Sequence, residues 1–257
     1  MTEGLTDLAQ HKMVLATDLD GTFLGGSDAD RDTLYSWIEA RRETVGLVFV
    51  TGRDPAFIAG LCAEGWVPQP DYVIGDVGTT IAHVAEDGAI EPLTPLEADI
   101  ADIWGDRGTT LRDKLDGHAG LSLQDTAFRY RLSYDMDPDR FDASAKAIVE
   151  DHGADALISD NRFFDVLPRG ISKGPSLVKL VDHLRIDRAR VLAAGDTLND
   201  LSMLVSGLPA VAVGGSEQPL LDALPPAPNI HRATRVGAAG ILEAIGVFDL
   251  HPQIHKA

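Results

Sequence analysis

Cysteine is nearly absent from this sequence, because Cys62 is the only one among 257 residues. A single cysteine excludes a disulfide within the chain and a cysteine-rich metal site. Its apolar neighbours in IAGLCAEG favour a buried small side chain over a nucleophile. No apolar run approaches the length of about eighteen residues that a membrane span needs. The acidic beginning MTEGLTDLAQHK lacks the basic and apolar parts of a secretory signal, so a cytoplasmic location is expected.

Basic residues are scarce as well: 22 lysines and arginines face 40 aspartates and glutamates, which gives a formal net charge of -18. Such a chain repels nucleic acids and anionic membranes, so neither is expected as a partner. An anionic small substrate would need a metal ion or a few focused cations. The hydrophobic fraction of 44% is ordinary for a globular protein that folds alone, as a monomer or small homo-oligomer.

Short apolar runs rich in β-branched residues alternate with helical patterns along much of the chain. The runs cover residues 13–17, 46–50, 71–75, 190–194 and 209–213. The helical patterns cover residues 30–42, 54–63, 174–185, 199–205 and 236–246. Near-continuous apolar runs of this length are typical of strands buried on both faces of a parallel sheet. The alternation predicts βαβ units and therefore an α/β fold with a doubly wound, Rossmann-like parallel sheet.

The middle of the chain has a different pattern, which predicts an insertion. Strand pairs accompany two longer helical stretches at residues 96–115 and 139–152. Asp87–Gly88 predicts a hairpin turn within AHVAEDGAIEP, and FRYRLSYDM alternates like a one-faced strand. The expected organisation is an α/β core of residues 1–82 and 169–257 with an inserted α+β cap of residues 83–168.

Polar side chains follow three of the predicted strands at the point where each strand ends. Asp18 and Asp20 follow the first, Thr51 follows the second, and GDTLND at residues 195–200 follows the fourth. In an open parallel sheet, ligands bind at the carboxyl ends of the strands. So many acids in a partly buried cleft would repel one another. Because all the donors are oxygen atoms, a magnesium ion is the predicted counter-charge.

Each of these stretches alone has an ordinary structural explanation. Two acids at a strand end most often form a turn with a side-chain hydrogen bond, and GDTLND could cap a helix. An EF-hand calcium loop is excluded, because a strand precedes Asp18 and Ala29 occupies the position where glutamate is needed. The combination in this order, each member at a strand end, is far rarer and favours one shared site.

Four short motifs occur in order: DLDGT at 18–22, TGR at 51–53, SKG at 172–174 and GDTLND at 195–200. This set resembles the haloacid dehalogenase (HAD) superfamily of phosphotransferases. The insertion lies between the second and third motifs, as in the HAD subgroup that carries a large α/β cap. Longer stretches resemble the sucrose-phosphate phosphatase family, which includes mannosylfructose-phosphate phosphatases. They are DYVIGDVGTTIAH at 71–83, DVLPRGISKG at 165–174 and GAAGILEAIGVFDL at 237–250.

The resemblance implies a reaction through a phosphorylated aspartate. It makes Asp18 the nucleophile that attacks phosphorus. Asp20 becomes the acid that protonates the leaving oxygen and then the base that activates water. Thr51, with its neighbour Gly52, and Lys173 would hold the phosphoryl oxygens.

The same resemblance implies the ligands of the magnesium ion. Asp18, the main-chain carbonyl of Asp20, and Asp196 would bind it. Asn199 and Asp200 would complete the site through water or by orienting the lysine.

The cap is expected to close over the core cleft and to recognise the leaving alcohol. Sugar hydroxyls need donors and acceptors paired to them, and Asp or Asn near an aromatic ring would supply these. The candidates in the cap are Arg129, Arg131, Tyr134, Ser159, Asp160, Asn161 and Asp165. In the core, Arg53 could contact substrate or pair with an acid, and the sequence leaves this open.

The expected function is magnesium-dependent hydrolysis of a sugar monophosphate. A disaccharide phosphate, such as sucrose 6-phosphate or mannosylfructose phosphate, is the expected substrate. The enzymatic alternatives are a sugar phosphomutase of the phosphomannomutase type and a broad sugar-phosphate phosphatase. The alternatives without catalysis are a phospho-aspartate receiver and a carbohydrate-binding module.

Overall fold

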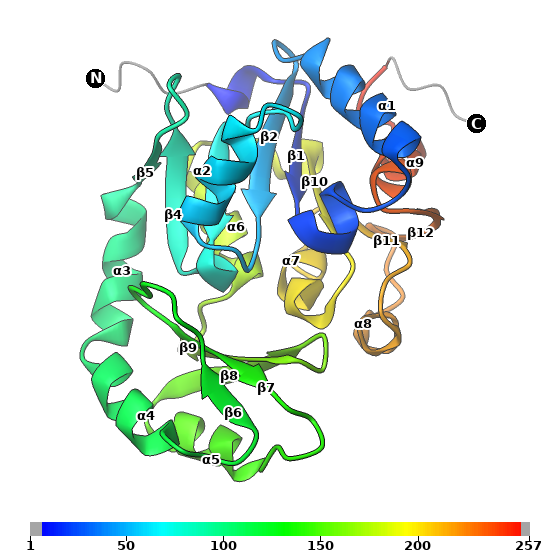
Figure 1. Ribbon diagram of the computed structural model, residues 1–257. Helices are drawn as coiled ribbons and strands as arrows, with labels where there is room; N and C mark the ends of the chain where they lie inside the picture. Colours follow the sequence, from blue (N-terminus) through cyan, green and yellow to red (C-terminus); the bar gives the residue numbers. More distant parts are fainter. Residues whose placement is uncertain (1–6, 253–257) are drawn as a thin grey trace.

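The computed structural model describes residues 7–252 and consists of two β-sheets with helices around them (Figure 1). Residues 1–6 and 253–257 lie outside the described part. The expectation that the chain begins without a secretory signal rests partly on residues 1–6, which lie outside the described residues. The two ends of the expected core, residues 1–6 and 253–257, lie outside them as well. Among the described residues, no helix combines the length and the apolar character needed to cross a membrane.

The larger sheet has eight strands in the order β12-β11-β10-β1-β2-β3-β4-β5. They are β1 (Met13–Thr17), β2 (Val45–Val50), β3 (Tyr72–Gly75), β4 (Thr80–Val84), β5 (Ile90–Pro92), β10 (Val191–Gly195), β11 (Ala210–Gly214) and β12 (Ile230–Val236). The strands from β12 to β3 are parallel, and β4 and β5 extend the sheet antiparallel. The predicted α/β fold is confirmed, and the five predicted apolar runs form β1, β2, β3, β10 and β11.

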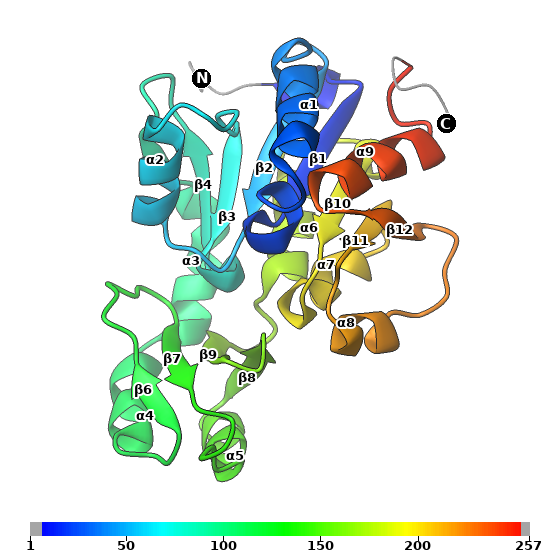
Figure 2. The ribbon, with the colours of Figure 1, turned by 45° about the vertical axis from the view of Figure 1, so that its right-hand side comes forward.

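Helices cover both faces of the larger sheet (Figure 2). One face carries α1 (Asp28–Glu39), α2 (Pro55–Ala63) and α9 (Ala238–Val247), and the other carries α6 (Lys173–His183), α7 (Leu201–Leu204) and α8 (Gln218–Ala223). Within β1, Met13 and Leu15 pack in the core with α1, whereas Val14 and Ala16 pack in the core with α6. Successive side chains of a strand point to opposite faces, so a strand covered on both sides must be apolar throughout.

The smaller sheet is antiparallel, has the strand order β6-β7-β9-β8, and forms the lower part of the molecule in Figure 1. Its strands are β6 (Leu121–Leu123), β7 (Leu132–Met136), β8 (Ala154–Ser159) and β9 (Phe163–Pro168). Helices α3 (Thr94–Trp104), α4 (Arg107–Leu115) and α5 (Ser144–Asp151) accompany it. A separate hydrophobic core around Leu111, Val149 and Phe164 holds this α+β cap together.

Several boundaries in the middle of the chain differ from the prediction. The expected start of the cap at residue 83 falls inside β4, and the β4–β5 hairpin pairs with β3 of the larger sheet. This hairpin covers the edge that β3 would otherwise expose. The predicted helix at 96–115 is two helices, because Gly105 at φ +53° ends the first. The predicted helix at 139–152 begins only at Ser144, and the strand predicted from residue 128 begins only at Leu132.

Candidate active site

The carboxyl ends of β10, β1 and β2 lie next to one another, because these three strands are adjacent and parallel. Asp18 follows β1, Thr51 follows β2 and Asp196 follows β10. The main-chain N–H of Asp18 donates to the carbonyl of Ala194 over 2.9 Å, which ties the ends of β1 and β10 together. The strand order therefore brings three separate sequence motifs to one edge of the sheet.

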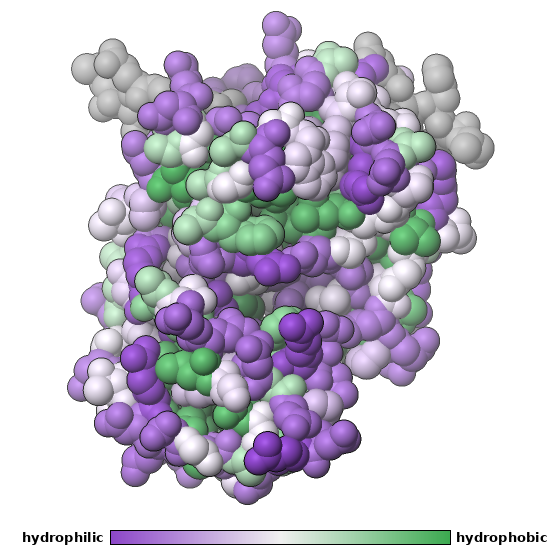
Figure 3. Space-filling view, viewed as in Figure 1, coloured by the Kyte–Doolittle hydropathy of each residue, from purple (hydrophilic) through white to green (hydrophobic). Residues whose placement is uncertain are grey.

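A cavity of about 430 Å³ opens at this edge, between the larger sheet and the cap. Hydrophilic side chains gather along the level where the two parts meet (Figure 3). The predicted site residues that line the cavity are Asp18, Asp20, Thr51, Gly52, Asp196 and Asn199 from the core and Arg131, Ser159, Asp160 and Asp165 from the cap. Lys173 and Asp200 are fully buried directly behind this lining.

Lys173 begins helix α6, and its ammonium group is surrounded by acceptors. Nζ donates to Asp18 Oδ1 over 2.7 Å, to Asn199 Oδ1 over 2.8 Å and to Asp200 Oδ1 over 2.6 Å. Burial alone would lower the pKa of Lys173, but Asp18 and Asp200 outweigh burial and raise it. The lysine therefore stays charged and holds the nucleophile candidate in one orientation.

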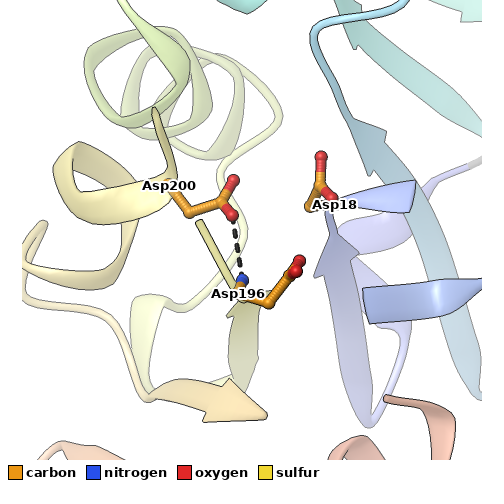
Figure 4. A group of neighbouring side chains, drawn as sticks. All are labelled: Asp18, Asp196 and Asp200. Carbon is orange, nitrogen blue, oxygen red and sulfur yellow. Dashed lines mark hydrogen bonds between the residues drawn. The ribbon is translucent and has the colours of Figure 1, made fainter. Parts of the chain in front are cut away.

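Three carboxylates gather at the bottom of the cavity. Asp18, Asp196 and Asp200 each place an oxygen within 4.8 Å of the others (Figure 4). Burial raises the pKa of Asp196 to about 7, and Asp200 adds to the rise. Burial also raises the pKa of Asp18 well above its usual value, against the opposing effect of Lys173. Among the described residues, Lys173 is the one cation bonded to this group, so the negative charge exceeds the positive charge.

The donors of this group fit a hard divalent cation. Both oxygens of Asp200 already accept hydrogen bonds from the protein. Lys173 donates to Oδ1, and the N–H groups of Asp196 and Thr197 donate to Oδ2 over 2.9 and 3.0 Å. Asp18 and Asp196 each keep an oxygen to which no described residue donates. Gly21 lets the chain approach closely, since a Cβ there would lie 2.2 Å from Asp196. Carboxylate oxygens and excess negative charge are what magnesium and similar ions bind.

Thr51 and Asp20 are both hydrogen-bonded to Arg53. The Thr51 side chain is buried, and its hydroxyl oxygen accepts the N–H of Arg53 over 3.1 Å, which leaves the hydroxyl proton to donate into the cavity. The half-exposed Asp20 carboxylate accepts two bonds from Arg53, from Nε over 2.8 Å and from Nη2 over 3.0 Å. The open question about Arg53 thus has a structural answer: it pairs with a core acid.

Three of the seven candidates from the cap, Arg129, Tyr134 and Asn161, lie away from the cavity. Tyr134 is buried in the hydrophobic core of the cap, with its ring centroid 6.3 Å from that of Phe164. Neighbouring residues of a strand point to opposite faces, and Arg131 occupies the other face of β7. Asn161 is exposed at the tip of the β8–β9 hairpin, where its φ of +46° suits the turn.

The cavity also contains residues that the sequence analysis did not select. They are Gly21, Val77, Gln124, Ser133, Phe163 and Thr197. Ser133 could have been found, because it lies two residues from Arg131 and therefore on the same face of β7. Val77 comes from the loop after β3, and its place in the cavity depends on the strand order of the sheet.

Comparisons with known proteins agree with this geometry. The sequence matches the model of a family described as sucrose-6F-phosphate phosphohydrolase over residues 11–249. A mannosylfructose-phosphate phosphatase from Agrobacterium fabrum (strain C58) is 29% identical over 250 residues, which cover 93% of this chain and 98% of the relative. A glucosylglycerol-phosphate synthase from Pseudomonas anguilliseptica is 42% identical over 238 residues, or 92% of this chain. The chain spans only 31% of the length of that synthase.

Among solved structures, the sucrose-phosphatase from Synechocystis sp. PCC6803 in complex with sucrose and phosphate matches with a TM-score of 0.83. The alignment covers 93% of this chain and 99% of that chain at 24% sequence identity. The two chains therefore have the same fold, including the cap.

Proposed function

Since the chain belongs to the sucrose-6F-phosphate phosphohydrolase family, we propose that it hydrolyses the phosphate ester of a small glycoside, with magnesium and a phosphorylated Asp18 as intermediate. At a coarser level, it is a sugar-phosphate phosphatase of the HAD superfamily, because the family that it belongs to and several of its relatives are phosphatases. One observation supports the finer proposal best. A single cavity joins the carboxylates of the core to polar residues of the cap.

In the first proposed step, Asp18 attacks the phosphorus atom of the substrate. Lys173 is bonded to Asp18 Oδ1 over 2.7 Å and holds the side chain in place, and one oxygen of the carboxylate would form the new bond to phosphorus. The bond between phosphorus and the sugar oxygen breaks at the same centre. Asp20 lies two residues further along and also lines the cavity, so its carboxyl group would give a proton to the leaving oxygen.

In the second proposed step, water attacks the phosphorus of the phosphorylated Asp18. Asp20, now a carboxylate, takes the proton of the water, and the bond between Asp18 and phosphorus breaks. Inorganic phosphate leaves, and both side chains return to their starting states. For these transfers Asp20 must be released from Arg53, with which it is paired in this structure.

Several neighbouring groups would stabilise the phosphoryl group during transfer. The Thr51 hydroxyl and the Gly52 main chain would donate to its oxygens, and Lys173 would offset the developing charge. Asp18, Asp196 and the main-chain carbonyl of Asp20 would hold the magnesium ion. When bound, this ion would neutralise charge on the phosphoryl oxygens and on the carboxylates.

The proposed substrate has a sugar joined to a second polyol unit. The cavity volume of about 430 Å³ leaves room beyond the phosphoryl group for such a leaving group, within the range of roughly 300–1,000 Å³ that small-molecule sites occupy. One relative is named for mannosylfructose phosphate and another for glucosylglycerol phosphate. The substrates to compare are therefore sucrose 6-phosphate, mannosylfructose phosphate and glucosylglycerol phosphate.

A phosphomutase would need cations that are available to hold a second phosphate, and of the arginines at 129–131 and 162–169 Arg131 and Arg162 line the cavity. Arg129 is bonded to Glu97 over 2.8 Å and to Thr80 over 3.1 Å. All three guanidinium nitrogens of Arg131 are likewise bonded to protein atoms. Hydrolysis needs no such second site.

The test is a panel of phosphorylated sugars assayed for phosphate release. With magnesium, we expect the three glycoside phosphates to exceed glucose 6-phosphate and fructose 6-phosphate in kcat/KM. Chelation by EDTA should abolish release, magnesium should restore it, and calcium should support it poorly because calcium is larger and coordinates more loosely. Equal turnover of the monosaccharide phosphates would leave a broad sugar phosphatase. Phosphoryl transfer within a sugar bisphosphate without release would favour the mutase.

A pair of variants on one turn tests the contribution of the cap. Asp160 lines the cavity and Asn161 does not, although both have positive φ, +52° and +46°. Glycine tolerates this backbone at either position. Asp160→Gly should lower kcat/KM for the preferred glycoside phosphate about tenfold, as expected for one lost polar contact. Asn161→Gly, the matched control, should leave kcat/KM unchanged, and equal effects of the two variants would contradict a role for Asp160 in recognition.

A further inference from the structure

Arg131 directly precedes β7 in the cap, and each nitrogen of its buried guanidinium group is bonded to protein atoms. Nε donates to Asp76 Oδ1 over 3.1 Å, and Nη2 donates to the main-chain carbonyl of Gly52 over 3.0 Å. Nη1 donates to Asp165 Oδ1 over 3.1 Å and to the hydroxyl of Ser133. We call these five residues the cap–core bridge. A guanidinium with every nitrogen bonded in this way has little left to offer a sugar hydroxyl.

The partners of Arg131 come from both parts of the molecule. Asp76 and Gly52 lie in loops that follow strands of the larger sheet, whereas Ser133 and Asp165 belong to the cap. Arg131 is 5% exposed, and Asp76 and Asp165 are buried to a similar degree. Moving the cap away from the core would separate Arg131 from Asp76 and from the Gly52 carbonyl. The bridge therefore forms only when the cap lies against the core as it does here.

On the core side, the bridge holds two loops at the carboxyl ends of β2 and β3. Two main-chain hydrogen bonds join these loops. The N–H of Val77 donates to the carbonyl of Thr51 over 3.1 Å, and the N–H of Asp76 donates to the carbonyl of Arg53 over 3.0 Å. Asp76 and Val77 have φ values of +53° and +58°. A β-branched residue such as valine rarely adopts this left-handed backbone, so surrounding contacts must maintain it.

These contacts connect the cap to the place where the phosphoryl group would bind. Gly52 accepts from Arg131 through its carbonyl and follows Thr51 directly. A shift of this loop would move the Thr51 hydroxyl and the Gly52 N–H together. Misplacement by about 1 Å far from the chemistry can lower a rate by about a hundredfold.

We propose that Arg131 is a positioning residue, which sets the phosphate-binding loop Thr51–Arg53 through Asp76 and the Gly52 carbonyl when the cap closes, and not a ligand of the sugar. The proposal rests on the proposed function, because it assigns Thr51 and Gly52 to the phosphoryl group. It couples cap closure to catalysis: the loop reaches its working geometry only when the cap covers the cleft.

The experiment compares two substrates that share the phosphoryl group and differ in the leaving group. p-Nitrophenyl phosphate offers no sugar hydroxyls, and the best glycoside phosphate of the panel offers several. Arg131→Lys keeps the charge and loses the planar fork, and Asp76→Asn keeps the shape and loses the charge. Each variant should lower kcat/KM by the same factor for both substrates, about 10- to 100-fold. The inhibition constant for inorganic phosphate should rise in parallel, and the double variant should lose little more than either single variant.

Arg107→Lys is the matched control. Arg107 also lies in the cap and bonds to main-chain carbonyls of His152, Ile103 and Trp104, all within the cap. Its replacement should leave both substrates and phosphate inhibition unchanged. If circular dichroism shows that Arg131→Lys is unfolded, the two substrates are compared with Asp76→Asn only.

The outcomes separate the competing explanations. A loss confined to the glycoside phosphate would overturn the proposal and return Arg131 to sugar recognition. Unchanged kinetics and phosphate inhibition in both variants would overturn it as well. If the wild type hydrolyses neither substrate, the proposed function fails. Calorimetric binding of inorganic phosphate to wild type and Asp76→Asn then still decides whether the bridge positions the loop.

Discussion

Replacing Asp196 with asparagine should stabilise the metal-free protein and remove its response to magnesium. The carboxylate of Asp196 lies partly buried beside Asp18 and Asp200. Asparagine has the same shape and keeps Oδ1, which accepts the hydroxyl of Thr22. The substitution therefore removes a charge and little else.

The expected magnitude follows from the pKa of Asp196, which burial and Asp200 raise from 3.8 to about 7. One pKa unit corresponds to about 1.4 kcal/mol, so full ionisation of Asp196 in the folded state costs about 4 kcal/mol. Partial exposure reduces this cost, and we expect about 2–3 kcal/mol. For a chain of this size, that corresponds to a Tm higher by about 5–10 °C.

The effect must depend on pH in one direction. The unfolded chain loses the Asp196 proton near pH 3.8, whereas the folded protein keeps it up to about pH 7. The cost of the carboxylate therefore appears as the pH rises from about 4 and is fully present above about 7. In EDTA, the variant and the wild type should unfold at similar temperatures near pH 4, and the variant should be the more stable at pH 8.

Magnesium should cancel most of this difference. At about a hundred times its Kd, a ligand that binds only the folded state adds about 2.7 kcal/mol to stability. Wild type should gain this stability, and the variant, with one carboxylate ligand fewer, should gain much less. Thermal unfolding at pH 8 with EDTA or with magnesium measures both effects. A variant no more stable than wild type in EDTA, or an equal magnesium shift in both proteins, would refute the reasoning.

Three further substitutions test individual side chains. Asp18→Asn removes the attacking oxygen charge, so phosphate release should fall by several orders of magnitude, and activity within about tenfold of wild type would exclude Asp18 as the nucleophile. Tyr134→Phe should leave kcat/KM unchanged and alter stability by no more than about 1 kcal/mol, because the buried hydroxyl has no hydrogen-bond partner among the described residues. A selective loss of activity on glycoside phosphates would place Tyr134 at the substrate. Arg53→Lys keeps the charge and loses the two-point hold on Asp20, which should ease the release of Asp20, so kcat should not fall; a fall in kcat of about tenfold would contradict the need for that release.

Local patterns of sequence were enough to predict the strands of the core and the edge at which the acids meet. Runs such as residues 13–17 are apolar throughout because helices cover both faces of the sheet. In parallel strands joined by helices, all carboxyl ends lie at one edge. A motif at the end of each run therefore had to come near the others, and Asp18, Thr51 and Asp196 do line one cavity.

The middle of the chain was less predictable, because its short strands can pair in more than one way. The hairpin at Asp87–Gly88 was expected from its turn residues, but turn chemistry does not say which sheet the hairpin joins. It joins β3, since that strand has an edge to cover. Similarly, Arg131 and Tyr134 both suit a sugar site by residue type. They are three residues apart on one extended segment, so their side chains point to opposite faces and only one of them can face the cleft.

The sequence by itself determined the α/β core and the set of acids, because both depend on residue type and local spacing. Only the tertiary structure decided what each polar group contacts. Lys173 is bonded to Asp18 and Asp200, which lie 155 and 27 residues away along the chain. Arg131 meets Asp76 across 55 residues and from another sheet. Such pairs form where separate elements pack together, and neither periodicity nor spacing within one element carries information about them.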